Sequence, residues 1–339
     1  MSVSISHSTL TTLEPGMQII YGGNCVFTVD ERLAQQFQPG DRLFMSENLP
    51  KPLVIPKYAI ELVETEIKCA QEGFYALAKV SDDQINAFYD YFSTNLLDNA
   101  IWAAIQQVNA EDVEKAKAKG RSTTRLVANQ RCRENMVAGL IDFKEQQVAR
   151  VTAVDSRLHD GWSVDLLKSP LGVVGFVFEG RPNVIADATG VLKTGNVGVF
   201  RVGQDALQTA NAILEKALYP ALDKAGISRN VIRILNSPER ATAWALFSNT
   251  KLNLAVARGS GGAVRLLGSI AQSHGIPVSL HGTGGAWMMT SESTELDRLE
   301  HAIVGSLDRK VCNTVNTICI LASEFSQQWP VVERALSTA

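Results

Sequence analysis

The sequence lacks any uncharged apolar run approaching the roughly 18 residues that a membrane-spanning helix needs. Its N-terminus lacks the basic start and apolar core of a secretory signal peptide. It also lacks an excess of one charge, because 32 Lys and Arg residues stand against 35 Asp and Glu residues, giving a formal net charge of −3. These absences predict a cytoplasmic chain that is neither secreted nor inserted in a membrane. They give no electrostatic reason to expect nucleic acid as a partner, and they favour small molecules.

Cysteine is scarce and widely spaced, which excludes two classes of small scaffold. The five cysteines, Cys25, Cys69, Cys132, Cys312 and Cys319, are odd in number and irregular in spacing. They therefore fit neither a disulfide framework nor a zinc knuckle, and we predict no metal site. A reducing compartment suits such a chain.

What is present is the composition of an ordinary globular protein, with 339 residues of which 45% are apolar and 20% charged. Residues 1–80 hold short β-type runs such as Gln18–Tyr21 and Cys25–Thr28, separated by glycine and proline turn signals, and predict a small β-rich extension of unknown role. From Asp82 to Gln147 the apolar positions recur every three to four residues, which predicts helices.

After Pro170 the chain alternates between buried-type apolar runs and helical segments. The predicted strands are 171–178, 197–200, 231–235, 252–257 and 277–280, and the predicted helices are 185–193, 205–224, 241–247 and one that ends at Gln272. Such alternation predicts an α/β fold with a doubly wound, Rossmann-like parallel sheet, which binds nucleotides at the carboxyl ends of its strands. We expect 81–282 to form a helical lead-in and nucleotide-binding domain, and 283–339 to begin a catalytic α/β domain.

Three of the predicted strands end in polar turns. The first strand ends in Glu179-Gly-Arg-Pro-Asn183, which leaves Arg181 and Asn183 at its carboxyl end. Another ends in Arg201-Val-Gly-Gln-Asp205, and a third in Ala257-Arg-Gly-Ser-Gly-Gly262, directly before a helix. Successive backbone N–H groups at such a helix start accept phosphate. A plain turn remains the alternative interpretation of the first, and a glycine-rich turn such as the third is common after a strand.

Cys312 stands in a run of small polar residues, Asp308-Arg-Lys-Val-Cys-Asn-Thr-Val-Asn-Thr317. Neighbours of this kind can raise the thiolate fraction of a cysteine or hold an oxyanion, so Cys312 is a candidate nucleophile. An inert, half-buried thiol is the simpler interpretation when this run is taken alone.

Several of these pieces, in their order, resemble the γ-glutamyl phosphate reductases of the aldehyde dehydrogenase superfamily. The resemblance runs from about Asn109 to Leu321 and is carried by Asn109-Ala-Glu-Asp-Val113, Ala116-Lys-Ala-Lys-Gly120, Pro170-Leu-Gly-Val-Val-Gly175, Glu179-Gly-Arg-Pro-Asn-Val184, Leu192-Lys-Thr-Gly-Asn196, Ala257-Arg-Gly-Ser-Gly-Gly262 and Val311-Cys-Asn-Thr-Val315. It implies an aldehyde dehydrogenase-type fold and an oxidoreductase that, in the complete protein, forms a homo-oligomer.

The resemblance also implies a reaction of proline synthesis. It is the reduction of γ-glutamyl 5-phosphate by NADPH, with NADH as the alternative donor, to glutamate 5-semialdehyde and phosphate. Cys312 would be the nucleophile and Asn183 an oxyanion donor. The resemblance places the cofactor at Arg201, Gly203, Arg258, Gly259, Ser260, Gly261 and Gly262. Arg181 at the strand end and the basic pair Arg309 and Lys310 are candidates for binding the substrate's anionic groups, with a solvated surface as the alternative interpretation of the pair.

The chain departs from the family at several positions. Leu280 takes the place of the glutamate that serves oxidising members as the base for thioester hydrolysis, unless the register shifts by one and His281 is that base. Asn316 replaces an acidic residue, and Val202 replaces a glycine of the ribose-side turn, where it would crowd the nucleotide. Family members also continue beyond the length of this chain, so we expect the last segment to be truncated.

Two other hypotheses stay open at this point. One is a related acyl-phosphate or aldehyde oxidoreductase of a specialised pathway, which the substitution at Asn316 and the unfamiliar first 80 residues favour. The other is a fragment or non-catalytic nucleotide-binding module that keeps the doubly wound core without the closing half of the cleft.

Overall fold

The computed structural model describes residues 9–46, 49, 51–282, 284–307 and 314–339. The chain divides into two compact units, which are described separately below. The first is formed by Met1–Arg258 with Leu266–Leu280, and the second by Gly259–Arg265 with His281–Ala339.

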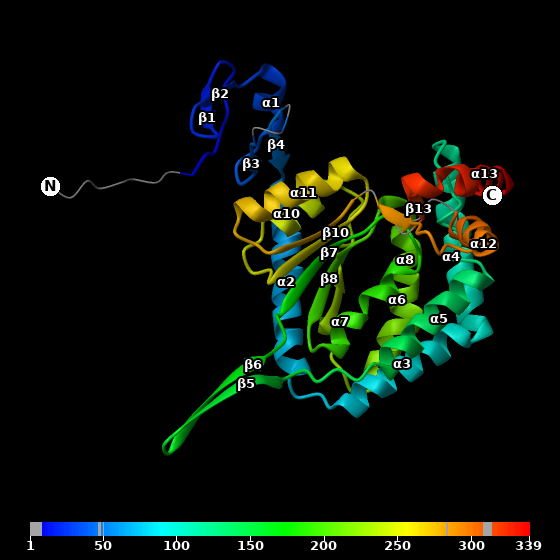
Figure 1. The fold of residues 1–339 in the computed structure, drawn as a ribbon. Helices are drawn as coiled ribbons and strands as arrows, with labels where there is room; N and C mark the ends of the chain where they lie inside the picture. The colour runs from blue at the N-terminus through cyan, green and yellow to red at the C-terminus, as the bar shows by residue number, and fades with distance from the viewer. Residues whose placement is uncertain (1–8, 47–48, 50, 283, 308–313) are drawn as a thin grey trace. The chain divides into compact units, whose positions relative to one another are not determined.

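The first unit is built around a five-stranded sheet in the order β11-β10-β7-β8-β9 (Figure 1). Its strands are β7 (Val173–Val177), β8 (Val197–Arg201), β9 (Ile232–Ile234), β10 (Leu254–Arg258) and β11 (Val278–His281). The pairs β10/β7, β7/β8 and β8/β9 are parallel. Every residue of β7 is buried, as expected of a central strand covered on both faces. The predicted α/β fold class is confirmed.

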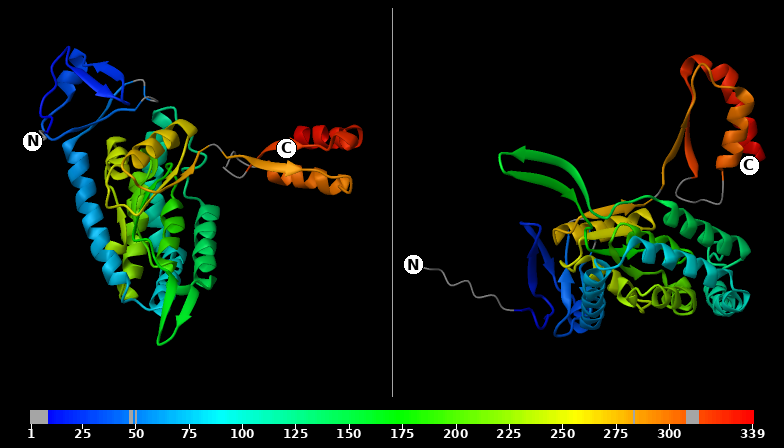
Figure 2. Two further views of the ribbon diagram at one scale, coloured as in Figure 1. Left: turned by 60° about the vertical axis from the view of Figure 1, so that its left-hand side comes forward. Right: turned by 90° about the horizontal axis from the view of Figure 1, so that it is seen from below.

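The connections of the sheet run in two directions. From β7 the chain passes to β8 and β9 on one side, then crosses back to β10 and β11 on the other, so the strand order reverses between β7 and β10. The views in Figures 1 and 2 agree that α6 to α8 cover one face and that α2 and α10 cover the other. The connecting elements are α6 (Val184–Ala188), α7 (Gly190–Lys193), η1 (Gln204–Ala206), α8 (Leu207–Ile213), η2 (Leu214–Leu218), α9 (Tyr219–Lys224), η3 (Arg229–Val231), α10 (Ala241–Phe247) and α11 (Gly261–Ser273).

The helix predicted over 205–224 is not a single α-helix. It begins with the 3₁₀ turn η1, continues as α8, passes through the π-helical turn η2 and resumes as α9, which has Pro220 in its first turn. Proline has no N–H to donate, and its ring clashes with the carbonyl four residues earlier. A local π-turn accommodates such a residue within a helix.

Four long helices precede the sheet: α2 (Lys57–Leu77), α3 (Asp82–Leu97), α4 (Asn99–Ala118) and α5 (Gln130–Glu145). The last three confirm the helical prediction for 82–147. Their starts follow from capping side chains, since Asp98 and Asn129 accept backbone N–H bonds and Ser81 forms a capping box with Gln84. Helix α3 packs against α5 and α9, and α4 packs against α8.

The N-terminal extension contains the two predicted β-runs as strands that pair antiparallel. Its elements are β1 (Gln18–Tyr21), β2 (Cys25–Thr28), α1 (Glu31–Gln36), β3 (Arg42–Phe44) and β4 (Leu53–Ile55). They enclose a small core of Leu13, Val29, Leu33, Phe37 and Val54. Helix α2 follows β4 directly.

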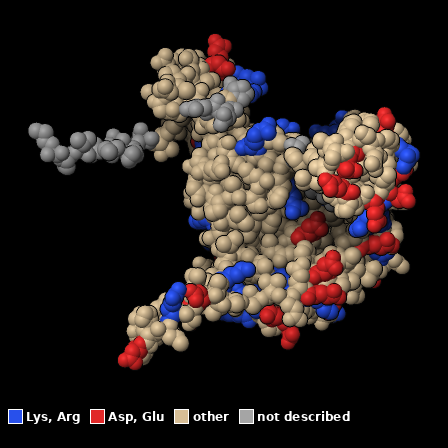
Figure 3. All heavy atoms as spheres, viewed as in Figure 1, with Lys and Arg blue, Asp and Glu red and all other residues tan. Residues whose placement is uncertain are grey.

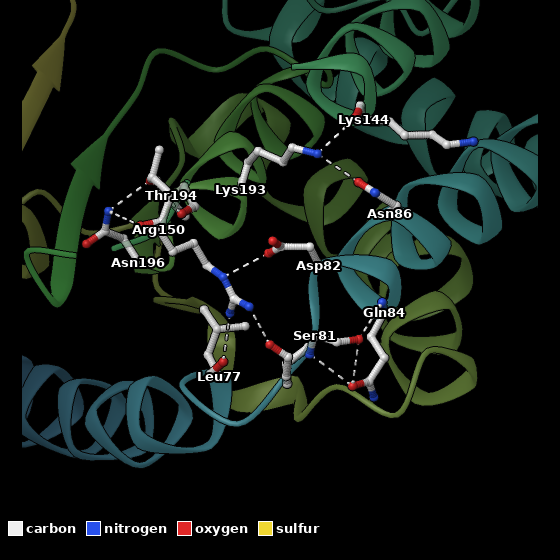
Figure 4. A network of polar contacts seen from close by, with 12 residues as sticks. Leu77, Ser81, Asp82, Gln84, Asn86, Lys144, Arg150, Lys193, Thr194 and Asn196 are labelled. Carbon is white, nitrogen blue, oxygen red and sulfur yellow. Dashed lines mark hydrogen bonds and ion pairs between the residues drawn. The ribbon is translucent and has the colours of Figure 1, made fainter. Parts of the chain in front are cut away.

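The antiparallel hairpin of β5 (Thr152–His159) and β6 (Trp162–Lys168) is not among the predicted elements. Every residue of both strands is exposed, and the hairpin projects from the first unit in Figures 1 and 2. Its base is held by Arg150, which donates from Nη2 to the carbonyl of Val80 at 2.6 Å and from Nη1 to that of Leu77 at 3.3 Å. Its Nε also pairs with the Asp82 carboxylate at 2.9 Å (Figure 4). The root of the hairpin is therefore fixed while both strands lie in solvent.

The second unit contains a parallel β-α-β arrangement followed by a helix. Strands β12 (Ala286–Met289) and β13 (Val315–Cys319) pair in parallel, α12 (Leu296–Ser306) lies between them in sequence, and η4 (Ala322–Glu324) leads into α13 (Phe325–Thr338). Its core contains Leu299, Ile303, Val331, Val332 and Ala335 from the two helices.

Candidate functional site

The carboxyl ends of β7 and β10 meet at the point where the strand order reverses. Open α/β sheets bind their ligands in the crevice at such a point. Stacked aromatic rings lie at this edge of the sheet. The ring centroid of Phe176 is 4.9 Å from that of Phe200 and 5.3 Å from that of Phe178. The guanidinium of Arg258, the last residue of β10, lies 5.9 Å from the centre of the Phe178 ring. Arg258 is exposed, so it offers a positive charge at the predicted cofactor edge.

Arg181, a predicted substrate residue, is not free at this edge. Its Nη2 donates to Oε2 of Glu179 at 2.7 Å, and Arg125 donates to the same oxygen at 3.4 Å. Two guanidinium groups therefore share one carboxylate. This arrangement fixes the turn after β7 and leaves an excess of positive charge over it.

Asn183 lies at the start of α6, and its side chain is held by the same helix. Its Nδ2 donates to Oδ2 of Asp187 at 3.1 Å, one helical turn later. Although Asp187 reaches the surface, desolvation raises the pKa of its carboxyl above the ordinary range, against the lowering influence of Arg258 and Arg181. Cys132 on α5 completes the group, since burial and then the Asp187 charge raise the pKa of its thiol to about 11. An unreactive thiol thus borders the site.

Arg201 ends β8 and is partly buried. Its Nη2 donates to the carbonyl of Pro238 at 3.1 Å, while its buried Nε has no hydrogen-bond partner among the described residues. Desolvation and the nearby Arg240 charge lower the pKa of Arg201. A buried guanidinium with an unused donor and a second cation beside it is an arrangement that an anionic ligand would complete.

A cavity of about 310 Å³ adjoins this end of β8. It is lined by Asp112, Lys115, Lys119, Gln204, Asp205, Leu207, Gln208, Asn236 and Pro238. It therefore borders both the turn after Arg201 and the Pro238 carbonyl that Arg201 contacts.

Gly203 occupies a point of close backbone approach. A Cβ at this position would lie 2.8 Å from Cα of Gly180, closer still to the Gly180 backbone nitrogen, and 3.1 Å from the carbonyl carbon of Glu179. Gly203 thus lets the turns after β7 and β8 come together. Neighbouring Val202 is fully buried, so its side chain does not cover the outer face of the turn, where crowding of a nucleotide was expected.

In the second unit, the predicted glycine-rich turn begins with a bond from Gly259 N to the His281 carbonyl, at 3.2 Å. The Ser260 carbonyl accepts from Val264 N, while Gly261 and Gly262 form the first residues of α11. Asn316 donates from Nδ2 to the Gly284 carbonyl at 2.6 Å, a bond that the acidic residue expected there could not donate in its ionised form.

Three predicted residues lie outside the described residues: the nucleophile Cys312 and the substrate residues Arg309 and Lys310. Their roles stay predictions. Leu280 and His281 are the two residues that could occupy the family's general-base position. Leu280, near the end of β11, is 37% exposed, and His281 interacts with another residue.

Sequence reasoning missed Asp187, Arg240 and Cys132. Asp187 had a signal, because a polar residue four positions after Asn183 shares its helix face. Arg240 and Cys132 had no such sequence signal, because long segments of chain separate them from the groups they face.

Acidic and basic side chains are interspersed on the face shown in Figure 3, without one large basic field. No cluster of three or more metal-binding side chains occurs in the described part of the chain. Within the same described residues, no helix combines the length and apolar character needed to cross a bilayer.

Comparison with known proteins decides the relationship. The chain is 30% identical over 277 residues to the gamma-glutamyl phosphate reductase of Shewanella pealeana, across 79% of this chain and 64% of that protein. It is also 30% identical over 226 residues to the enzyme of that name from Moorella thermoacetica, across 64% and 53%. The chain is homologous to the γ-glutamyl phosphate reductases. The resemblance carried by the motifs is confirmed, although no family model matches the chain.

The solved structures agree about the fold. The gamma-glutamyl phosphate reductase of Thermotoga maritima superposes with a TM-score of 0.70 at 23% identity, covering 81% of this chain and 67% of that one. An acetylating aldehyde dehydrogenase from Geobacillus thermoglucosidasius superposes with a TM-score of 0.58 at 16% identity, covering 82% and 59%. The fold is of the aldehyde dehydrogenase type. The chain spans less than two thirds of the length of the two curated reductases that it matches.

Proposed function

We propose that the protein containing this chain reduces γ-glutamyl 5-phosphate to glutamate 5-semialdehyde with release of phosphate, a step of proline synthesis. The observation that carries the proposal is the gathering of Asn183, Arg181 and Arg258 at the reversal point of a sheet homologous to that of the reductases. An amide donor and two guanidinium groups at one edge suit an acyl phosphate, which combines a polarisable carbonyl with an anionic leaving group.

In this proposal Cys312 is the nucleophile. Its sulfur forms a bond to the acyl carbon as the bond from that carbon to phosphate breaks, and the electron pair leaves with phosphate. The Asn183 N–H would stabilise the oxygen charge that develops at the carbonyl. After hydride addition to the same carbon, the C–S bond breaks, which releases the aldehyde and restores the thiolate.

A nicotinamide dinucleotide would supply the hydride when bound. The chain's residues fit such a group at Arg201, where an Nε with no partner in the described part of the chain and the adjoining cavity of about 310 Å³ leave positive charge and space for a nucleotide. We assign the remaining cofactor contacts to Gly203, Arg258, Gly259, Ser260, Gly261 and Gly262, in keeping with the motif order.

We infer further that NADPH is preferred over NADH. Arg201 and Arg240 are two cations without an ion-pair partner in the described residues, and the extra phosphate of NADP is the group that distinguishes the two cofactors. Arg240→Ala should raise the KM for NADPH about tenfold to a hundredfold, the equivalent of one charge-assisted contact, and leave the KM for NADH within twofold. Equal losses for the two cofactors would contradict this preference.

The reaction is tested by following NADP reduction with glutamate 5-semialdehyde in the presence and absence of phosphate or arsenate. We expect activity that depends on the anion and disappears in Cys312→Ser. Cys319→Ser is the matched control, because it removes a thiol that follows Cys312 closely in the sequence, on β13, and should leave the rate unchanged. Full activity of Cys312→Ser would refute the mechanism.

The substitution at Asn316, whose side chain donates to the Gly284 carbonyl, motivates a second candidate, an acyl-phosphate or aldehyde oxidoreductase with another substrate. This bond shows that the substitution is integrated into the local structure. A panel of acyl phosphates, acyl thioesters and aldehydes separates the two, since a hundredfold preference for a donor without the glutamyl group would replace the proline-pathway assignment. Dinucleotide binding without any Cys312-dependent turnover would instead indicate a non-catalytic module.

The proposal includes a homo-oligomer in the cytoplasm. Val154, Leu158, Trp162, Val164 and Leu166 are exposed on the hairpin, and an isolated two-stranded hairpin is marginal in water. Most of its visible surface in Figure 3 is uncharged. Cover by a second copy would remove this apolar surface from water, and a thiolate nucleophile needs a reducing compartment. Replacing Leu158 and Trp162 with Ser should convert the oligomer to monomers in sedimentation.

A further inference from the structure

Asp187 controls which end of the Asn183 side chain faces it. An ionised carboxylate only accepts hydrogen bonds, so the contact from Asn183 Nδ2 to Asp187 Oδ2 requires the nitrogen end of the amide to point at Asp187. One N–H of Asn183 is used in this bond, and the second remains for another acceptor. Without such a partner, the terminal torsion of an asparagine has broad minima, and the amide can present either its oxygen or its nitrogen.

We propose that Asp187 is a positioning residue for catalysis, which holds the Asn183 amide so that its second N–H faces the oxyanion of the reacting carbonyl. The inference rests on the proposed function, because Asn183 is an oxyanion donor only in that reaction. An inverted amide would place its oxygen against the developing negative charge, and repulsion would then replace stabilisation.

Two arginines partly offset the effect of burial on the Asp187 charge. Desolvation, the largest influence, opposes the carboxylate, whereas Arg258, at the end of β10, and Arg181, in the turn after β7, favour it. The thiol of Cys132 on α5 is close enough for the Asp187 charge to raise its pKa. Of the helices packed on α6, α8 has no charged residue, and α7 has only Lys193, whose ammonium donates to Asn86 Oδ1 and the Lys144 carbonyl.

Protonation would make one Asp187 oxygen a donor that can pair with the amide oxygen of Asn183, so the nitrogen end of the amide would no longer be selected. Because the pKa of Asp187 is raised, the orientation should be lost at a higher pH than for an ordinary aspartate. The stabilised geometry is present above that pKa and lost as the pH falls through it.

The kinetic test uses the full-length protein with Asp187→Ala, Asp187→Asn, Asn183→Ala and the double variant Asn183→Ala/Asp187→Ala. We expect Asp187→Ala to lower kcat about tenfold to a hundredfold, below the loss of a complete oxyanion donor, with the KM for NADPH within twofold. In the Asn183→Ala background the same change should have no further effect. Asp187→Asn should recover part of the rate, since its amide oxygen can accept the same bond. Asp223→Asn is the control for loss of a surface carboxylate, and its kcat should equal that of the wild type.

A second measurement separates failure of this inference from failure of the proposed function. The side-chain NH₂ resonances of ¹⁵N-labelled Asn183, assigned by their loss in Asn183→Ala, should shift with pH and lose that dependence in Asp187→Ala. Resonances indifferent to Asp187 would overturn the inference whatever the activity, and so would an unchanged kcat in Asp187→Ala when Asn183→Ala is impaired. If the wild-type protein has no Cys312-dependent activity, the proposed reaction is the part that fails.

Discussion

Gly203→Ala is expected to destabilise the first unit, and the structure gives the size of the effect. The backbone at Gly203, with φ −55° and ψ 141°, is open to alanine, so the cost is steric alone. The added Cβ meets backbone atoms of Gly180 and Glu179, which no side-chain rotation can move away. Overpacking of this kind costs about 3 kcal/mol at the upper end of its usual range. Alanine also reduces the conformational entropy of the unfolded chain, which offsets about 0.4–1 kcal/mol of this destabilisation. The net loss in the free energy of unfolding is therefore about 2 kcal/mol.

Urea denaturation followed by far-ultraviolet circular dichroism measures this change. Gly139→Ala is the matched control, because Gly139 lies inside α5 and, apart from the adjacent backbone of that helix, no described atom lies within 4 Å of the added Cβ. There alanine should stabilise the protein by about 0.5–1 kcal/mol through its helix propensity. If Gly203→Ala is as stable as the wild type, the two turns do not approach as described, and the geometry assigned to the site is incorrect.

Two further substitutions and one reactivity measurement test the structure around the site and at the root of the hairpin. Asp112→Asn should lower the free energy of unfolding by about 2 kcal/mol. The reason is that the buried Asp112 carboxylate accepts hydrogen bonds from N and Oγ1 of Thr209, at 2.9 and 2.8 Å. A change below about 0.5 kcal/mol in a urea titration would contradict this. Arg150→Met should free the root of the hairpin and speed its cleavage in limited proteolysis at least severalfold, and an unchanged rate would show that other contacts hold it. Cys132 should react with iodoacetamide at pH 8 about a hundredfold more slowly in the folded than in the urea-unfolded protein, because folding raises its pKa from 9.0 to about 11. Peptide mass spectrometry measures the two rates. Since the folded state keeps this proton longer, its contribution to stability should fall as the pH rises from 9 towards 11.

Most of the sheet could be predicted from the sequence because each parallel strand is a short apolar run bounded by glycine or proline. The hairpin could also have been predicted, since Asp160-Gly161 separates two alternating runs and Gly161 has φ +79°. The contact between Arg201 and the Pro238 carbonyl could not be predicted from the sequence, because it depends on how the segment between β8 and α10 folds. Patterns of local period identify elements, whereas long-range contacts depend on packing that the period does not encode.

The strand order also constrains when this sheet can form during synthesis. Strand β7 is made first and lies in the centre, but its neighbour β10 is completed only at Arg258, some 80 residues later. Until then β7 would have one unpaired edge, made of apolar residues and exposed to the ribosome's surroundings. Loop closure over such a separation delays the pairing. A nascent chain that pauses before β10 would therefore be a natural target for chaperones, and synthesis speed across residues 178–258 would affect the yield of folded protein.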